Sequence, residues 1–143
     1  MTRTYGQYCS VARALDVVGD RWVLLIVREL LDGPKRYRDL QDGLEGIATD
    51  MLASRLRGME ADGLVRRRTL GPPAASRVYE LTEHGLALEP VLIELARFGT
   101  PLLGRRSRAE PFHAHWIRLA LATLLSDSSD EEPRAFWSHA VAR

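Results

Sequence analysis

The stretch G-I-A-T-D-M-L-A-S-R-L-R-G-M-E-A-D-G-L, residues 46–64, decides the fold of this chain. Apolar residues recur at Leu52, Leu56 and Met59, and spacings of four and three predict a helix over about residues 49–62. Thr49 is a residue type that caps helix starts, and Gly63 ends the pattern. The sequence therefore predicts one amphipathic helix with a single buried stripe.

The opposite face of this helix carries its polar residues. At about 100° per residue, Asp50, Ser54 and Arg57 point away from the buried stripe, with Arg55 on the flank. These side chains are the candidates for reading base edges, and Arg57 is suited to guanine because a guanidinium can donate two parallel hydrogen bonds to it. For Asp50, two interpretations stay open: accepting from a cytosine amino group, or capping the helix.

Two strand candidates follow, V-R-R-R-T-L at residues 65–70 and R-V-Y-E-L at residues 77–81, joined by a Gly-Pro-Pro turn. Strand alternation sends Arg66 and Arg68 to one side and Arg67 to the other. A helix followed by a basic hairpin is typical of a winged helix-turn-helix that faces DNA. We therefore expect phosphate or minor-groove contact from at least one of the hairpin arginines Arg66, Arg67, Arg68 and Arg77. Phosphate contacts would position the protein without specifying sequence.

Three further helices are expected before residue 46. Residues 9–18 carry Val11, Leu15 and Val18 at helical spacing, and Asp20 is placed to cap an almost wholly apolar core helix over residues 22–31. Residues 35–37 are a connector or minimal strand. Residues 37–44 form a short helix with Leu40 and Leu44 inward.

After the hairpin, Thr82 is placed to cap a helix running to about residue 98, with a kink or break near residue 89 because of Pro90. Its apolar stripe predicts a dimer interface. Residues 105–108 resemble a solvated linker, 113–125 an amphipathic helix, 126–133 an acidic turn and 136–141 a last short helix. The apolar candidates of the 113–125 helix are Trp116, Ile117, Leu119, Ala120 and Leu124.

Composition limits the class of protein. The chain has 143 residues, 45% of them hydrophobic, with a formal net charge of +1 and a single cysteine. No apolar run is long enough to span a bilayer, and the first eight residues lack the apolar core of a signal peptide. A lone cysteine suits a reducing compartment, so a cytoplasmic protein without membrane contact is expected. The weak net charge means that local clustering of arginines must attract nucleic acid.

Three segments together resemble the HxlR-type transcriptional regulators of the MarR-like group. The first is C-S-V-A-R-A-L-D-V-V-G-D-R-W-V-L-L-I-V-R-E-L-L-D-G-P-K-R-Y-R-D-L; the others are L-R-G-M-E-A-D-G-L-V and V-Y-E-L-T-E-H-G. The resemblance covers roughly residues 8–103. Departures are Ser10 in place of the family proline and Arg21 in place of the common lysine.

The resemblance implies an α+β, mainly α fold: a winged helix-turn-helix with flanking N- and C-terminal dimerisation helices. It places this domain in residues 1–104 and leaves residues 105–143 as a linker and short helical extension. The implied function is a homodimeric regulator, with repression favoured, on a pseudo-palindromic double-stranded DNA operator whose half-sites lie about one helical turn apart. The expected DNA-binding residues are Arg36, Thr49, Asp50, Ser54, Arg55, Arg57, Arg66, Arg68 and Arg77, and the expected dimerisation residues are Val11, Leu15, Leu88, Leu92, Leu95 and Phe98.

Two residues are candidates for sensing a signal. Cys9 matches a cysteine that senses thiol-reactive compounds in some members of the family, and the alternative is a small buried hydrophobe. With no second cysteine, only a bond to Cys9 of a second copy, a mixed disulfide or an adduct could form. Trp22 is interpreted as a core residue at the base of an effector cavity, and whether a small-molecule effector binds stays open.

Other function classes are less favoured. The sequence carries no phosphate-binding loop or nucleophile–base pair, so an enzyme is not expected, nor a cofactor. His113 and His115, two apart on the expected helix, would diverge by about 200° and not share a metal. Residues 112–125 weakly resemble the start of a sterol-carrier-like domain, but too few residues remain for a second core. The alternative function is a winged-helix protein–protein adaptor that has lost DNA binding.

Overall fold

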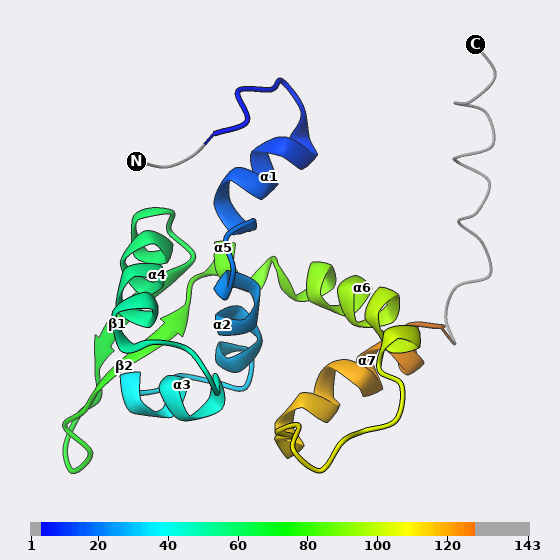
Figure 1. The fold of residues 1–143 in the computed structure, drawn as a ribbon. Helices are drawn as coiled ribbons and strands as arrows, with labels where there is room; N and C mark the ends of the chain where they lie inside the picture. The colour runs from blue at the N-terminus through cyan, green and yellow to red at the C-terminus, as the bar shows by residue number, and fades with distance from the viewer. Residues whose placement is uncertain (1–3, 128–143) are drawn as a thin grey trace.

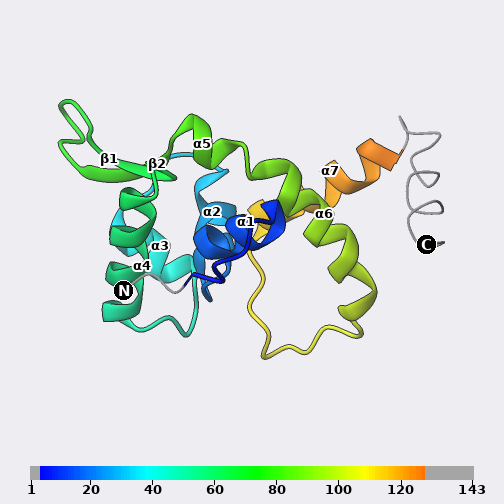
Figure 2. The same cartoon turned by 90° about the horizontal axis from the view of Figure 1, so that it is seen from above.

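The computed structural model describes residues 4–127. Most of the described residues are helical, a two-stranded antiparallel sheet lies at one edge, and the central helix α2 (Val23–Leu30) divides the molecule into two ends. Helix α4 (Thr49–Ala61) and strands β1 (Val65–Thr69) and β2 (Arg77–Leu81) lie on one side of it, and α6 (Glu89–Gly99) and α7 (Ile117–Asp127) lie on the other, in both views (Figures 1 and 2).

The predicted core is confirmed. Ile26 and Val27 of α2 are fully buried, and Leu52, Leu56 and Met59 of α4 pack into the same cluster. Asp50, Ser54 and Arg57 are exposed, as the helical spacing predicts. Burying such side chains contributes roughly 1.5–3 kcal/mol each, so this cluster fixes how α4 lies against α2.

The predicted caps of two helices are wrong. Helix α1 (Ser10–Val18) ends at Gly19, but α2 starts only after Trp22, which adopts a left-handed conformation with φ 82°, so Asp20 does not cap it. Helix α4 has Ala48 at its N-cap position, and Thr49 is already its first residue. The Thr49 hydroxyl instead accepts from Gln41 Nε2 at 2.8 Å, which ties α4 to the preceding helix α3 (Tyr37–Gly43).

The hairpin pairs in the register that the alternation predicts. Arg66 lies opposite Glu80, and Arg67 opposite Tyr79. The connector before α3 forms one isolated bridge, between Lys35 and Tyr79, so it lies beside β2 while the sheet itself has two strands. The winged helix-turn-helix is thus complete: α3, a turn, α4 and the β1–β2 wing.

The helix after the wing is broken where Pro90 predicts. Helix α5 (Glu83–Leu86) is capped by Thr82, whose hydroxyl accepts from Gly85 N at 3.1 Å, and α6 restarts at Glu89 with Pro90 in its first turn. A proline is tolerated there because the first helical N–H groups have no partner within the helix. The short 3-10 turn η1 (Thr100–Leu102) follows.

The end of the described chain folds back onto the domain. A 3-10 turn, η2 (Ala114–Trp116), precedes α7, and α7 packs along α6 with Leu119 against the core (Figure 1). The predicted helix over 113–125 therefore begins four residues later than expected. The acidic turn predicted at 126–133 is helical at residues 126 and 127, and its remainder and the helix predicted at 136–141 lie outside the described residues.

Candidate nucleic-acid interface

The outward face of α4 is the first part of the candidate interface. Arg57 is exposed and makes no polar contact within residues 4–127, so its guanidinium is available to a ligand. Asp50 is also exposed, and its Oδ1 accepts from the backbone N of Met51 at 2.9 Å. That contact satisfies a first-turn N–H and leaves the second carboxylate oxygen available.

Arg55 is positioned differently from its neighbours. Its Nε donates to the carbonyl of Arg21 at 3.0 Å, and its guanidinium lies 3.4 Å from Asp20. Its side chain is only 23% exposed. Arg55 therefore fastens α4 to the loop between α1 and α2, which supplies both of these partners.

The wing supplies the second part of the interface, and its arginines are paired with glutamates. Arg66 and Arg68 donate to the two oxygens of Glu80 at 2.8 and 3.2 Å, and Arg67 donates to Glu60 at 2.7 Å. These arginine side chains are exposed, so each ion pair lies at the surface. Exposed pairs contribute little to stability, and phosphates can compete for their arginines.

The charges of the wing act on one another. The Arg66 guanidinium, with a smaller contribution from Arg68, holds the pKa of the Glu80 carboxyl below its usual value. Hydrogen bonding to Glu60 raises the pKa of Arg67. Both effects keep the groups ionised at neutral pH. Beside them, Arg77 has no polar partner in the part of the chain that is described, and a shallow hollow lies between Arg67, Arg68, Thr69 and Arg77.

Two further predicted contact residues lie beside α4. The exposed Arg36 precedes α3, and its backbone N donates to Asp39 at 3.0 Å. The backbone carbonyl of Thr49 accepts from the Tyr37 hydroxyl at 2.5 Å. The structure therefore gathers α3, which Arg36 precedes, with α4 and the wing at the same end of the molecule, away from α6 and α7 (Figures 1 and 2).

The predicted dimerisation stripe divides into two parts. Leu92 is 6% exposed and belongs to the protein's own core, and Leu88 is partly buried against that core. Leu95 and Phe98 remain exposed, Phe98 at 76%. On α1, Val11 and Leu15 are exposed as well. The outward apolar surface of α6 is thus narrower than the sequence predicts, because Leu92 packs inward.

The two candidate sensing residues differ in access. Cys9 is exposed immediately before α1, unlike the buried small hydrophobe of the alternative interpretation. Trp22 is partly buried and packs against the core, with the Arg21 guanidinium 5.4 Å from its ring centroid.

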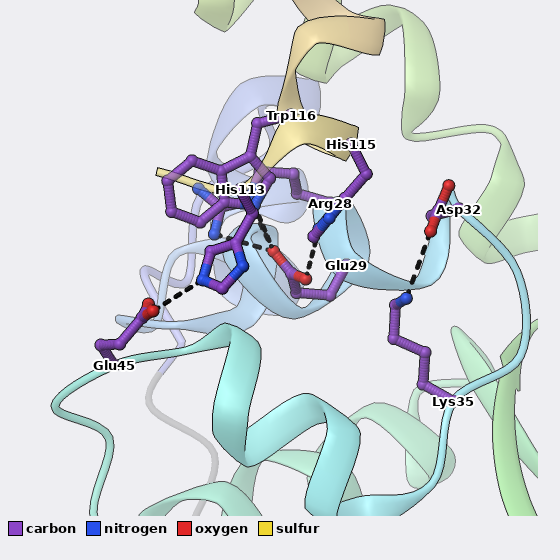
Figure 3. A network of polar contacts seen from close by, with 8 residues as sticks. All are labelled: Arg28, Glu29, Asp32, Lys35, Glu45, His113, His115 and Trp116. Atoms are coloured by element: carbon purple, nitrogen blue, oxygen red, sulfur yellow. Dashed lines mark hydrogen bonds and ion pairs between the residues drawn. The ribbon is translucent and has the colours of Figure 1, made fainter. Parts of the chain in front are cut away.

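The buried carboxylate of Glu29 on α2 was not among the predicted site residues. Glu29 is 1% exposed, and its oxygens accept from Arg28 at 3.1 Å and Trp116 Nε1 at 2.7 Å and lie 2.7 Å from His115 Nε2 (Figure 3). Arg28, Glu29, His115 and Trp116 are called the Glu29 cluster below. A glutamate inside an otherwise apolar helix, with an Arg beside it, was the available signal; its partners lie more than 80 residues away.

The two histidines do not diverge as predicted. His113 is extended and precedes η2, so the segment is not a regular helix there, and the rings of His113 and His115 lie 5.6 Å apart. Each nevertheless faces its own carboxylate: His113 Nε2 lies 2.6 Å from Glu45 Oε1. No group of three or more His, Cys, Asp or Glu residues within 4–127 is arranged to hold a metal ion. Nor is any helix of that range long and apolar enough to cross a membrane.

A recognition helix with an exposed polar face, followed by a basic β-hairpin, defines a winged-helix transcriptional regulator. The family model described as HxlR-like helix-turn-helix matches residues 17–107. The chain belongs to this HxlR-like family.

Relatives agree in sequence and in structure. The HTH-type transcriptional regulator sll1512 of Synechocystis is 35% identical over 103 residues, which cover 71% of this chain and 76% of that protein. The reduced form of the regulator YodB of Bacillus subtilis superposes with a TM-score of 0.59 and 31% identity, over 71% of this chain and all of that one. The redox regulator HypR in its oxidised form gives a TM-score of 0.60 at 32% identity, over 69% and 99%. This protein is thus a transcriptional regulator of the HxlR type.

Proposed function

We propose that this regulator represses transcription as a homodimer that binds a pseudo-palindromic operator in double-stranded DNA. One observation carries the proposal: helix α4, whose exposed Arg57 has no polar partner among residues 4–127, and the arginine-rich wing lie at the same end of the molecule (Figures 1 and 2). This arrangement allows α4 to enter the major groove while the basic hairpin contacts the phosphate backbone of the DNA.

Helix α4 and the wing have different roles in the proposed DNA binding. Asp50, Ser54 and Arg57 read base edges, with Arg57 on guanine. The wing arginines and Arg36 bind phosphates and supply affinity that does not depend on sequence. Arg55 acts indirectly, since its guanidinium already contacts Asp20 and the Arg21 carbonyl. In this proposal α4 discriminates between DNA sequences, and the wing supplies affinity for DNA of any sequence.

Dimerisation uses the apolar side chains that α1 and α6 leave exposed. Val11 and Leu15 are 65% and 44% exposed, and Leu95 and Phe98 are 44% and 76% exposed. Apolar surface of this size on two helices favours burial against a second copy. In this assignment Leu88 and Leu92 support the interface from within the protomer.

Cys9 couples the regulator to a thiol-reactive signal. Its thiol is exposed, and among the relatives HypR is a redox regulator and YodB was solved in a reduced form. A bond to Cys9 of the second protomer, a mixed disulfide or an adduct at the start of α1 would disturb a helix assigned to the dimer. We further propose that the protein works in the cytoplasm, with the DNA-binding and dimerisation domain in residues 1–104 and an extension in residues 105–143.

The test is selection of duplexes from a pool of genomic fragments by the full chain, followed by binding measurements over a range of salt. Arg57→Ala should lose roughly 1–3 kcal/mol of discrimination between the selected duplex and a scrambled one. Arg68→Gln should instead weaken binding to both duplexes alike, with a salt slope lower by about 1. Failure to select any duplex, together with a stable hetero-complex in a pull-down, would favour the adaptor function.

A further inference from the structure

The segment after the wing domain contacts the helix-turn-helix at two points. His115 and Trp116 bind the buried carboxylate of Glu29 on α2, and His113 binds Glu45, which lies in the turn between α3 and α4 (Figure 3). All three residues lie beyond position 107, where the match to the family ends.

The first contact is rigid because Glu29 is enclosed. Besides its three hydrogen-bond partners, Gly43 at the end of α3 leaves no spare room: a Cβ there would lie 2.6 Å from Glu29 Oε2. Trp116 also stacks on Arg28, whose guanidinium lies 3.9 Å from the ring centroid. A carboxylate removed from water needs such partners, and two of the three come from the extension.

The second contact reaches the α3–α4 turn, in which Leu44 and Ile47 are buried in the core but Glu45 and Gly46 are exposed. Glu45 is followed by Gly46 in a left-handed conformation with φ 88°, which glycine adopts at little steric cost. One backbone bond, from Ile47 N to the Leu44 carbonyl at 3.0 Å, closes the turn. His113 adds a tie from outside, and its ring packs on Trp116 at a centroid distance of 4.9 Å. The tie is thereby joined to the Glu29 cluster.

We propose that His113 is a positioning residue for DNA recognition: through Glu45 it fixes the α3–α4 turn and so sets the direction of the recognition helix α4. The inference rests on the proposed DNA-binding function and deepens it. His113 lies at the extension side of the turn and does not touch the outward face of α4. Its effect therefore appears in discrimination between sequences and not in general affinity for DNA.

The experiment is a double-mutant cycle with His113→Ala and Glu45→Ala in the full chain. The probes are one duplex selected by the wild-type protein and one scrambled duplex, at matched salt. Each single variant should lower the ratio of the two affinities roughly three- to tenfold, and the double variant should be no worse than either single. The ratio is used because Glu45→Ala removes a negative charge and would tighten binding to any duplex.

His84→Ala is the matched control, since His84 is exposed on α5 and has no polar partner among the residues described. Both partners of the tie are accessible, His113 at 33% and Glu45 at 42%, so the variants should fold with thermal midpoints close to that of the wild type. An unchanged affinity ratio in His113→Ala, or additive losses in the double variant, would overturn the proposal.

Hydrogen exchange separates this inference from the proposed function. In His113→Ala the amides of residues 44–51 should exchange faster, while those of the β1–β2 wing keep the wild-type rate. If the wild type selects no duplex, the DNA-binding function fails, and the exchange result alone decides whether His113 orders the turn. If duplexes are selected and the exchange of the turn does not change, the inference fails and the function stands.

Discussion

Both the wing and the Glu29 cluster pair a glutamate with cationic or N–H donors. The arginines of these pairs are exposed on the wing, whereas the glutamate of the cluster is buried. On the wing, Arg66 and Arg68 are 66% and 49% exposed and share Glu80 in water. In the cluster, Glu29 is 1% exposed and its partners come from two distant parts of the chain. Surface pairs exchange partners at little cost, whereas a buried carboxylate that loses its partners is strongly destabilising. The same residue types therefore serve ligand exchange in one region and rigidity in the other.

The largest effect on stability is expected from removing the Glu29 carboxylate from the Glu29 cluster. Glu29→Ala leaves the Trp116 N–H without its acceptor and the partly buried Arg28 without its counter-charge, so unfolding should become easier by about 2–4 kcal/mol. Urea denaturation measures this loss. Asp32→Ala is the control, because Asp32 is 46% exposed and its pair with Lys35 lies at the surface. That variant should change stability by less than about 0.5 kcal/mol; equal losses for both would refute the contrast.

Two glycines in the helices test the enclosure of Glu29 at a smaller scale. Gly43→Ala places a methyl group 2.6 Å from Glu29 Oε2 and should cost about 1–3 kcal/mol. Gly58→Ala meets nothing within 4 Å on the outer side of α4 and should stabilise by roughly 0.5–1 kcal/mol. In a Glu29→Ala background, Gly43→Ala should become nearly neutral. Thermal unfolding of Gly43→Ala, Gly58→Ala, Glu29→Ala and the Glu29→Ala/Gly43→Ala double variant measures these changes in stability. If Gly43→Ala is still destabilising in the Glu29→Ala background, Gly43 does not enclose Glu29.

This contrast also explains which features the sequence predicts. The recognition helix and wing follow from local rules: the spacing of Leu52, Leu56 and Met59, and the alternation of the wing arginines. Pro90 likewise predicts the break before α6. Each of these depends on residues within one or two turns of each other. The family resemblance adds the assembly of these elements into a domain.

The errors arise where distant segments meet. Thr49 does not cap α4, because its hydroxyl accepts from Gln41 of the neighbouring helix. Leu92 packs into its own core, and Glu29 takes partners from positions 115 and 116. No pattern within a window of neighbouring residues records such contacts, so neither the Glu29 cluster nor the tie from His113 to Glu45 could be predicted.

The wing is expected to respond to a change that should leave the core intact. Glu80→Gln removes the carboxylate shared by Arg66 and Arg68 and should tighten binding to any duplex roughly two- to tenfold at low salt, with a steeper salt dependence. Fluorescence anisotropy with a scrambled duplex measures both quantities. Glu83→Gln makes the same change in net charge on α5, where its side chain pairs with no arginine of residues 4–127. If the two variants behave alike, net charge and not release of the arginines is the cause.

The smallest effect is the titration of Glu80 itself. Arg66, and to a lesser degree Arg68, lower the pKa of this carboxyl in the folded protein. The ionised Glu80 therefore contributes fully to stability above the pKa that its carboxyl has in the unfolded chain. This contribution is lost as the pH falls through the lower pKa that the carboxyl has in the folded protein. An NMR titration of the Glu80 side-chain carboxyl should give a midpoint below that of an unpaired glutamate, and Arg66→Gln should raise it. An unchanged midpoint in Arg66→Gln would mean that the arginine does not hold the carboxylate in solution, and the exchange of partners assigned to the wing would lose its basis.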